Sequence, residues 1–156
     1  MKEEAGDNPG VAAPPPVIYI VPLLAGLFFN WVFPIGFLPG PLPLVLGLPV
    51  TAAGIIVFGW AVWTMTRAGT SPDPDQPTKK IVVEGPFRFT RNPIYVSFTM
   101  IYLGIAMSVN ALWSVLFLPV ALLIVRHGVI AREERYLERK FGPEYLQYKA
   151  RVRRWI

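Results

Sequence analysis

The sequence predicts an all-α membrane protein with about four transmembrane helices, and composition and charge distribution support this. Of the 156 residues, 53% are hydrophobic and 16% are charged, whereas about 25% of the residues in a soluble domain are charged. No Asp, Glu, Lys or Arg occurs in residues 8–66 or 92–125, and apolar runs of about 18 or more residues are typical of membrane spans. Cysteine is absent, which excludes a disulfide-stabilised secreted scaffold.

Residues 1–16 are predicted to form a flexible lead into a single integral membrane domain, residues 17–156. Three consecutive prolines, Pro14 to Pro16, make the end of this lead stiff. Before them, Lys2 is outnumbered by Glu3, Glu4 and Asp7, whereas a secretory signal peptide begins with basic residues. We therefore expect the first apolar stretch to be retained as a helix.

The apolar runs predict membrane spans at about residues 17–33, 42–65, 94–109 and 112–131. The first two are separated by a stretch rich in proline and glycine, which indicates a turn. The uncharged stretch 94–125 is too long for one helix across a hydrocarbon core of roughly 30 Å. We expect a helical hairpin turning near Asn110, with the second helix continuing past Val125.

Two polar segments complete the predicted domain: a loop, residues 66–92, and a C-terminal helical tail, residues 132–156. The fifteen Lys and Arg residues all fall on one side of the four-span arrangement, because the turns 34–41 and 109–111 contain none. The positive-inside rule then places both termini and the polar segments in the cytoplasm, at the inner membrane if the source is bacterial. The net charge of +5 suits anionic lipid headgroups as partners, and we do not expect nucleic acid binding.

The polar loop has the composition of a binding site at its C-terminal end. Gly85-Pro86 indicates a turn, and Arg88 and Arg91 are interleaved with aromatic residues. Asn92-Pro93 is a helix-start signal, with Asn92 as the cap, and the N-terminus of a helix can hold an anionic group. The alternative interpretation is an interfacial loop whose arginines pair with lipid headgroups.

Glu133 and Glu134 follow the last predicted span, and neither has a basic residue three or four positions away on its own helix. Surface acids on helices usually have such partners. One interpretation is that the pair receives a cation or a cationic ligand. The other is that both are solvated acids with arginine partners elsewhere in the fold.

In combination, these segments resemble the isoprenylcysteine carboxyl methyltransferase family and its phospholipid methyltransferase relatives. That family has Gly-Pro-[Tyr/Phe]-Arg before Arg-His-Pro-x-Tyr at a helix start, then Glu-Glu leaving the last membrane helix, then Phe-Gly-x-x-Tyr-x-x-Tyr. The corresponding segments here are Gly85-Pro86-Phe87-Arg88, Arg91-Asn92-Pro93-Ile94-Tyr95, Glu133-Glu134, and the run from Phe141 to Tyr148. The resemblance covers roughly residues 69–154.

The resemblance implies an integral membrane methyltransferase that uses S-adenosylmethionine, releases S-adenosylhomocysteine and needs no metal. The acceptor would be lipophilic and would arrive laterally from the bilayer, bearing a carboxylate, an amine or a similar group. The cofactor would lie between the loop and the last helices. The residues implied for cofactor binding are Ile81, Val82, Val83, Gly85, Asn92, Pro93, Tyr95, Glu133 and Glu134.

Arg91, Tyr95 and Arg126 are the candidate catalytic residues. An arginine can orient a carboxylate acceptor by a bidentate contact. Arg126 is the only charge partly inside the last span, and the competing explanation is that it snorkels to the interface.

The chain departs from the family at Asn92, which replaces the signature histidine. Asparagine cannot titrate near neutral pH, so this position cannot act as a general base. His127 is the only histidine. Without a clear base, the sequence slightly favours an acceptor that needs no deprotonation.

Two other function classes remain open at this point: a small four-helix transporter subunit, and a scaffold without catalysis. Proton-coupled transport usually leaves an ionisable residue inside a span, and the first three predicted spans have no acidic or basic residue. A scaffold would tolerate loss of the glutamate pair, whereas a methyltransferase would lose cofactor binding. The sequence does not indicate the oligomeric state.

Overall fold

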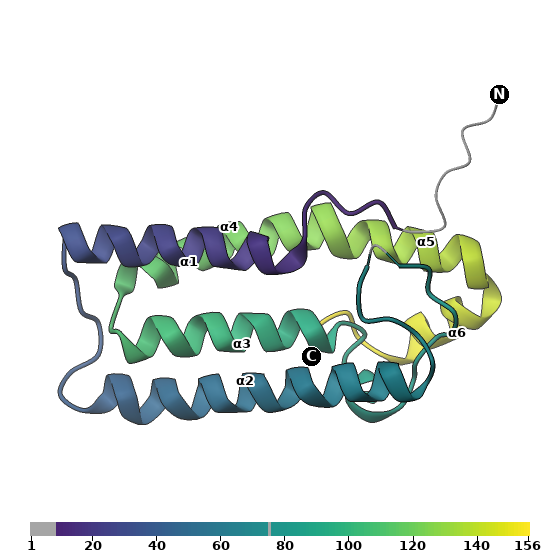
Figure 1. The fold of residues 1–156 in the computed structure, drawn as a ribbon, viewed down its shortest axis with the longest axis horizontal. Helices are drawn as coiled ribbons and strands as arrows, with labels where there is room; N and C mark the ends of the chain where they lie inside the picture. The colour runs from purple at the N-terminus through teal and green to yellow at the C-terminus, as the bar shows by residue number, and fades with distance from the viewer. Residues whose placement is uncertain (1–8, 75) are drawn as a thin grey trace.

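The computed structural model describes residues 9–74 and 76–156, and all the helices and turns in this part of the chain form a helical bundle with a polar end (Figure 1). The four apolar helices are α1 (Pro15–Val32), α2 (Leu42–Arg67), α3 (Pro93–Ser108) and α4 (Leu112–Ile124). The polar end consists of the 3-10 turn η1 (Gly85–Arg88), the π-helical segment η2 (Val125–Ile130), α5 (Ala131–Phe141) and α6 (Pro143–Arg151). The all-α membrane fold class predicted from the sequence is confirmed.

Three of the helical stretches are long and apolar enough to cross a membrane: Pro15–Val32, Leu42–Arg67 and the continuous stretch Leu112–Phe141. The fourth apolar helix, α3, has 16 residues and is about 24 Å long at 1.5 Å per residue. A hydrocarbon core is roughly 30 Å thick, so α3 is shorter than the layer that its neighbours cross.

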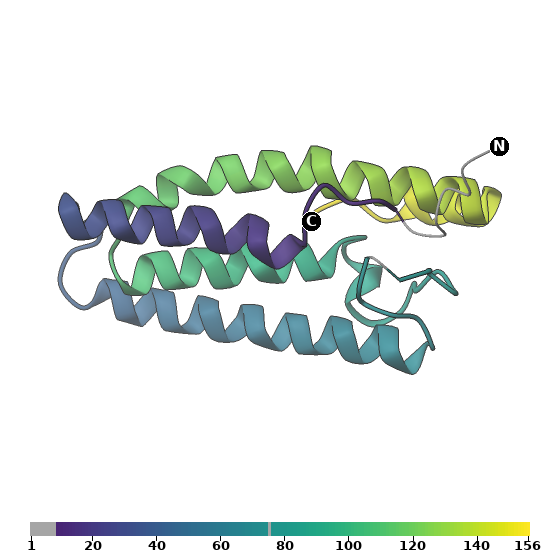
Figure 2. The same cartoon turned by 45° about the horizontal axis from the view of Figure 1, so that its top comes forward.

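The bundle consists of two helix pairs, α1 with α4 and α2 with α3, and α3 also contacts both members of the first pair (Figure 2). The α2–α3 pair is the closest, because Gly47 and Gly54 on α2 face α3, and Gly104 on α3 faces Thr51. Small residues at such positions let two membrane helices approach backbone to backbone.

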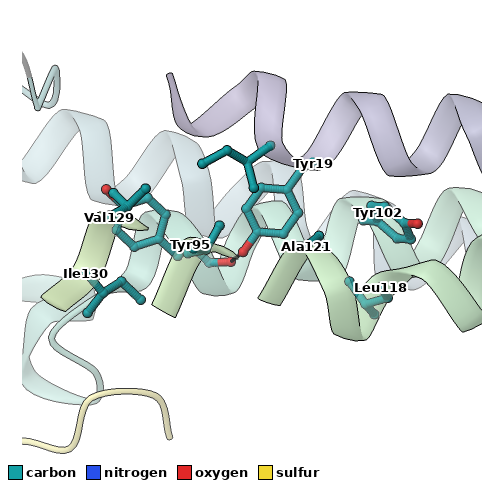
Figure 3. Packing of buried hydrophobic residues seen from close by; sticks show 9 residues of the cluster. Tyr19, Tyr95, Tyr102, Leu118, Ala121, Val129 and Ile130 are labelled. Atoms are coloured by element: carbon teal, nitrogen blue, oxygen red, sulfur yellow. Dashed lines mark hydrogen bonds between the residues drawn. The ribbon is translucent and has the colours of Figure 1, made fainter. Parts of the chain in front are cut away.

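A cluster of buried side chains holds α1, α3, α4 and η2 together, with tyrosines at its centre (Figure 3). The hydroxyl of Tyr19 donates to the backbone oxygen of Tyr95 at 3.1 Å, and that of Tyr102 donates to the backbone oxygen of Ser114 at 2.7 Å. These bonds satisfy polar groups that would be costly to bury unpaired. Tyr95, a predicted site residue, is thereby fixed at the start of α3.

The hairpin between α3 and α4 turns at Asn110, the residue around which the sequence predicts it. Asn110 has a φ of 54°, a left-handed conformation that asparagine adopts more readily than most residues. Its side-chain oxygen accepts from the backbone nitrogens of Phe37 at 2.9 Å and Leu38 at 3.0 Å. This one side chain therefore joins the two turns at the end of the bundle away from the polar segments.

The start of the first helix differs from the sequence prediction. The first helix begins at Pro15, within the predicted lead, because proline is well suited to the first turn of a helix. Residues 1–8 of that lead lie outside the described residues, and residues 9–13 pack on η2: the nitrogen of Ala12 donates to the oxygen of Gly128 at 3.1 Å. The last helix continues past Val125, as the sequence predicts, because α4 runs through η2 into α5.

Candidate active site

A pocket lies at the polar end of the bundle, between the loop that follows α2, the start of α3, and the helices α5 and α6. Its empty space, which includes the open mouth, is about 830 Å³. The loop contributes Ile81 and Val82, the start of α3 contributes Ile94, and α6 contributes Tyr145 and Tyr148. The walls therefore combine apolar and aromatic surface with the charged groups described below.

The structure brings most of the predicted site residues together in this pocket. Those that line it are Ile81, Val82, Arg91, Asn92, Pro93, Tyr95, Glu133 and Glu134. They come from three separate parts of the chain, which the fold joins at the start of α3.

Three of the predicted site residues, Val83, Gly85 and Arg126, do not line the pocket. Val83 is exposed, whereas Ile81 is buried. Gly85, with a φ of +57°, packs against Trp60 and Thr64 of α2. Arg126 is exposed on η2, whose buried side chains are Val125, Val129 and Ile130.

Glu133 forms a short hydrogen bond with Tyr95 at the pocket wall. The tyrosine hydroxyl donates to Oε1 of Glu133 at 2.6 Å. Glu133 belongs to α5, the charged helix beyond the membrane spans. Loss of hydration in the pocket raises its pKa to about 7, against the lowering effect of the Tyr95 hydrogen bond and with a further increase from neighbouring Glu134. Glu133 can therefore gain or lose a proton close to neutral pH.

Glu134 is buried and is the centre of an ion-pair cluster. Its Oε2 accepts from Nη2 of Arg154 at 2.6 Å and its Oε1 accepts from Nε of Arg154 at 3.0 Å, while Nη1 of Arg91 lies 3.1 Å from Oε1. Lys149 is 4.0 Å away and also pairs with Glu138. One interpretation of the glutamate pair was two solvated acids with arginine partners elsewhere in the fold. Glu134 has such arginine partners, but it is buried and not solvated.

The segment 152–155 folds back onto the motif that starts α3. The backbone nitrogen of Arg91 donates to the oxygen of Arg153 at 2.9 Å. The side chains of Asn92 and Thr90 donate to the oxygen of Arg154 at 2.8 Å and 3.1 Å. Asn92 is the N-cap residue of α3 and Pro93 its first residue, as predicted, but the Asn92 side chain makes no capping hydrogen bond with the helix.

Arg91 remains short of hydrogen-bond acceptors. Its side chain is only 8% exposed, and neither Nε nor Nη1 has a hydrogen-bond acceptor among the described residues. The Nη1 contact with Glu134 is thus an ion pair by distance, without hydrogen-bond alignment. A buried donor without an acceptor is unfavourable, and these donors belong to a residue that lines the pocket.

Sequence reasoning did not assign a site role to Arg154, Tyr145 or Tyr148. The two tyrosines belong to the Phe-Gly-x-x-Tyr-x-x-Tyr run, which was a usable signal. Burial raises the pKa of Tyr145 to about 12, and the hydroxyl of Tyr148 donates to the backbone oxygen of Phe87 at 2.8 Å. Arg154 had no such signal, because its role depends on how the last residues fold back.

The sequence model of the family described as phospholipid methyltransferase matches residues 42–144, about two thirds of the chain. The chain belongs to the phospholipid methyltransferase family. An uncharacterized protein of Haemophilus influenzae (strain ATCC 51907 / DSM 11121 / KW20 / Rd) is 40% identical over 63 residues, which are 40% of this chain and 100% of that protein. No solved structure matches the chain.

Membership of the phospholipid methyltransferase family indicates methyltransferase activity on a membrane substrate. The matched residues contain α2, α3, the loop between them and α5, and so include Arg91, Tyr95, Glu133 and Glu134. They end before Arg154, which closes the ion-pair cluster. The pocket is therefore built mainly from the shared part of the family and completed by residues beyond it.

Proposed function

We propose that this chain transfers a methyl group from S-adenosylmethionine to a lipophilic acceptor that reaches the pocket from the bilayer. The observation that supports this most directly is the pocket itself, in which a carboxylate, unsatisfied guanidinium donors and apolar walls meet at the start of α3. The charge distribution favours a cytoplasmic pocket, where S-adenosylmethionine would be available.

The pocket residues fit the chemical groups of this cofactor. S-adenosylmethionine has a sulfonium, an ammonium, a carboxylate, ribose hydroxyls and a flat adenine. Glu133 offers a carboxylate toward cationic groups or hydroxyls, and Arg91 has buried donors without aligned acceptors. Ile81 and Val82 offer apolar surface of the kind that an adenine contacts.

When bound, the cofactor would supply a methyl group on carbon already activated by the sulfonium. The chain's task is then to align donor and acceptor and to keep water out. Tyr95 is suited to the alignment, because its ring is buried and its backbone oxygen accepts from Tyr19 and Thr99.

Glu133 offers the proton acceptor that Asn92 cannot provide. A carboxylate acceptor is already nucleophilic, whereas an amine or hydroxyl must lose a proton, and a general base works best with a pKa near the operating pH. The pKa of Glu133 is raised to about 7 by burial. The pocket therefore has suitable groups for either kind of acceptor.

The test is transfer of label from S-adenosylmethionine carrying a tritiated methyl group to lipids in vesicles containing purified protein. The probes are phosphatidylethanolamine as an amine, oleate as a carboxylate, and a total lipid extract. We expect extractable label with wild type and a loss of at least tenfold in Glu133→Ala. Arg139→Ala, an exposed change on the same helix outside this pocket, should retain the wild-type rate. Absence of label from every lipid with folded wild-type protein would contradict the proposal.

A further inference from the structure

One carboxylate, that of Glu134, is shared by two guanidiniums at the pocket wall. Arg91 and Arg154 both lie within 3.1 Å of it, and Lys149 is 4.0 Å away but is paired with Glu138. The oxygens of Glu134 are therefore already engaged, and the cluster has an excess of positive charge. Such a wall attracts an anion, whereas one of the two interpretations of the sequence was that the glutamate pair receives a cation or a cationic ligand.

Arg91 is the member of the cluster with unsatisfied hydrogen-bonding capacity. Its side chain is 8% exposed and lines the pocket, and its Nε and Nη1 have no hydrogen-bond acceptor among the described residues. Hydrogen bonds from a guanidinium to a carboxylate are charge-assisted and about twice as strong as neutral ones. The anion that would suit these donors is therefore a carboxylate.

Arg154 holds the other side of Glu134. Its Nε and Nη2 engage both oxygens of that carboxylate at 3.0 Å and 2.6 Å, and the hydrogen bond raises the pKa of Arg154. Its backbone oxygen accepts from the side chains of Thr90 and Asn92, on either side of Arg91. The side chain and backbone of this one residue thus restrain both the ion-pair partner and the backbone of Arg91.

We propose that Arg154 is a positioning residue, which fixes Glu134 and the 90–92 backbone so that Arg91 binds the carboxylate of the cofactor's amino-acid end. This inference rests on the proposed function, because it assumes that the pocket takes S-adenosylmethionine. It also assigns different roles to the two adjacent glutamates. Glu134 organises the arginines, and Glu133 faces the ligand.

The test compares two ligands that differ only in the carboxylate: S-adenosylhomocysteine and its decarboxylated analogue, 5′-deoxy-5′-(3-aminopropylthio)adenosine. Equilibrium dissociation constants are measured for each on purified protein in lipid nanodiscs. Wild type should bind S-adenosylhomocysteine at least tenfold more tightly than the analogue. Arg154→Ala and Arg91→Ala should reduce this ratio to below threefold, with the affinity for the analogue changed by less than threefold.

Arg153→Ala is the matched control, because its side chain is exposed and only its backbone contacts Arg91; it should keep the wild-type ratio. Arg154→Gln serves if Arg154→Ala does not fold, and it should also lower the ratio. An unchanged ratio in the Arg154 variants, or an equal loss of affinity for both ligands, would overturn the assignment. Failure of wild type to bind either ligand would instead overturn the proposed function.

Discussion

Two adjacent glutamates of this chain have opposite environments, although they differ by one position on the same helix. Glu134 is surrounded by Arg91 and Arg154, whereas Glu133 has the hydroxyl of Tyr95 as its partner. The sequence indicated that the pair is unusual, because neither glutamate has a basic partner on its own helix. It could not separate their roles, because the separating groups come from α3 and from the residues after α6.

The environment of Glu133 predicts a pH-dependent stability. Its pKa rises from a usual value of 4.5 to about 7 on folding, chiefly through burial, so the folded state holds the proton more tightly. The contribution of Glu133 to the free energy of unfolding is therefore greatest below about pH 4.5 and falls as the pH rises through 7. The whole effect is at most about 3 kcal/mol.

Thermal unfolding of wild type and Glu133→Gln in detergent micelles, from pH 5 to pH 8, checks this prediction. The variant has no proton to lose, so its unfolding temperature relative to wild type should rise by several degrees across that range. Parallel pH profiles for the two proteins would contradict a titrating Glu133.

At the scale of the helices, the sequence defines where apolar segments run but not which faces meet. In a membrane both the lipid and the neighbouring helices are apolar, so hydrophobic periodicity does not identify the packed face. Glycines carry that information instead. Gly104 of α3 lies against the backbone and hydroxyl of Thr51 in α2, whereas Gly59 of α2 has no atom within 4 Å of where a Cβ would be.

Gly104→Ala and Gly59→Ala should therefore have opposite effects. A Cβ at Gly104 would collide with the backbone of α2, and overpacking of this kind typically costs about 1–3 kcal/mol. At Gly59 the added methyl group has space, and replacing a helical glycine by alanine stabilises by about 0.5–1 kcal/mol. Thermal unfolding of the two variants measures the difference, and equal effects would mean that α2 and α3 are not in backbone contact.

The segment η2 could not be predicted, because π-helical geometry has no reliable sequence signature. Such segments are often found at functional sites. Here η2 connects the membrane part of the last helix to α5, and its Gly128 oxygen accepts from Ala12. The prediction that the last helix continues through Arg126 and His127 is therefore confirmed. The local change from α-helical to π-helical winding was not predicted.

At the scale of the whole molecule, composition and charge were sufficient to predict a membrane helical bundle, whereas the arrangement of its helices in pairs was not accessible. The same charge pattern predicts orientation, with the pocket on the cytoplasmic side. The absence of cysteine makes this testable with single-cysteine variants. Pro39→Cys lies at the turn before α2, and Gln76→Cys lies in the loop before α3; both positions are exposed.

In intact bacterial cells, a membrane-impermeant maleimide should label Pro39→Cys and should label Gln76→Cys only after permeabilisation. The physical reason is that basic loops remain on the cytoplasmic side during insertion. Labelling of Gln76→Cys but not Pro39→Cys in intact cells would reverse the orientation and place the pocket outside the cytoplasm.

The central claim is that the pocket at the start of α3 binds S-adenosylmethionine, and a pair of neighbouring substitutions tests it most directly. Val82 lines the pocket, whereas Val83 is exposed and does not. We would measure equilibrium binding of S-adenosylmethionine to wild type, Val82→Trp and Val83→Trp, after checking that all three unfold at similar temperatures. The account predicts saturable binding that Val82→Trp weakens at least tenfold and Val83→Trp leaves within twofold of wild type. Equal binding by all three proteins would show that the cofactor lies elsewhere, and no binding by wild type would contradict the claim itself.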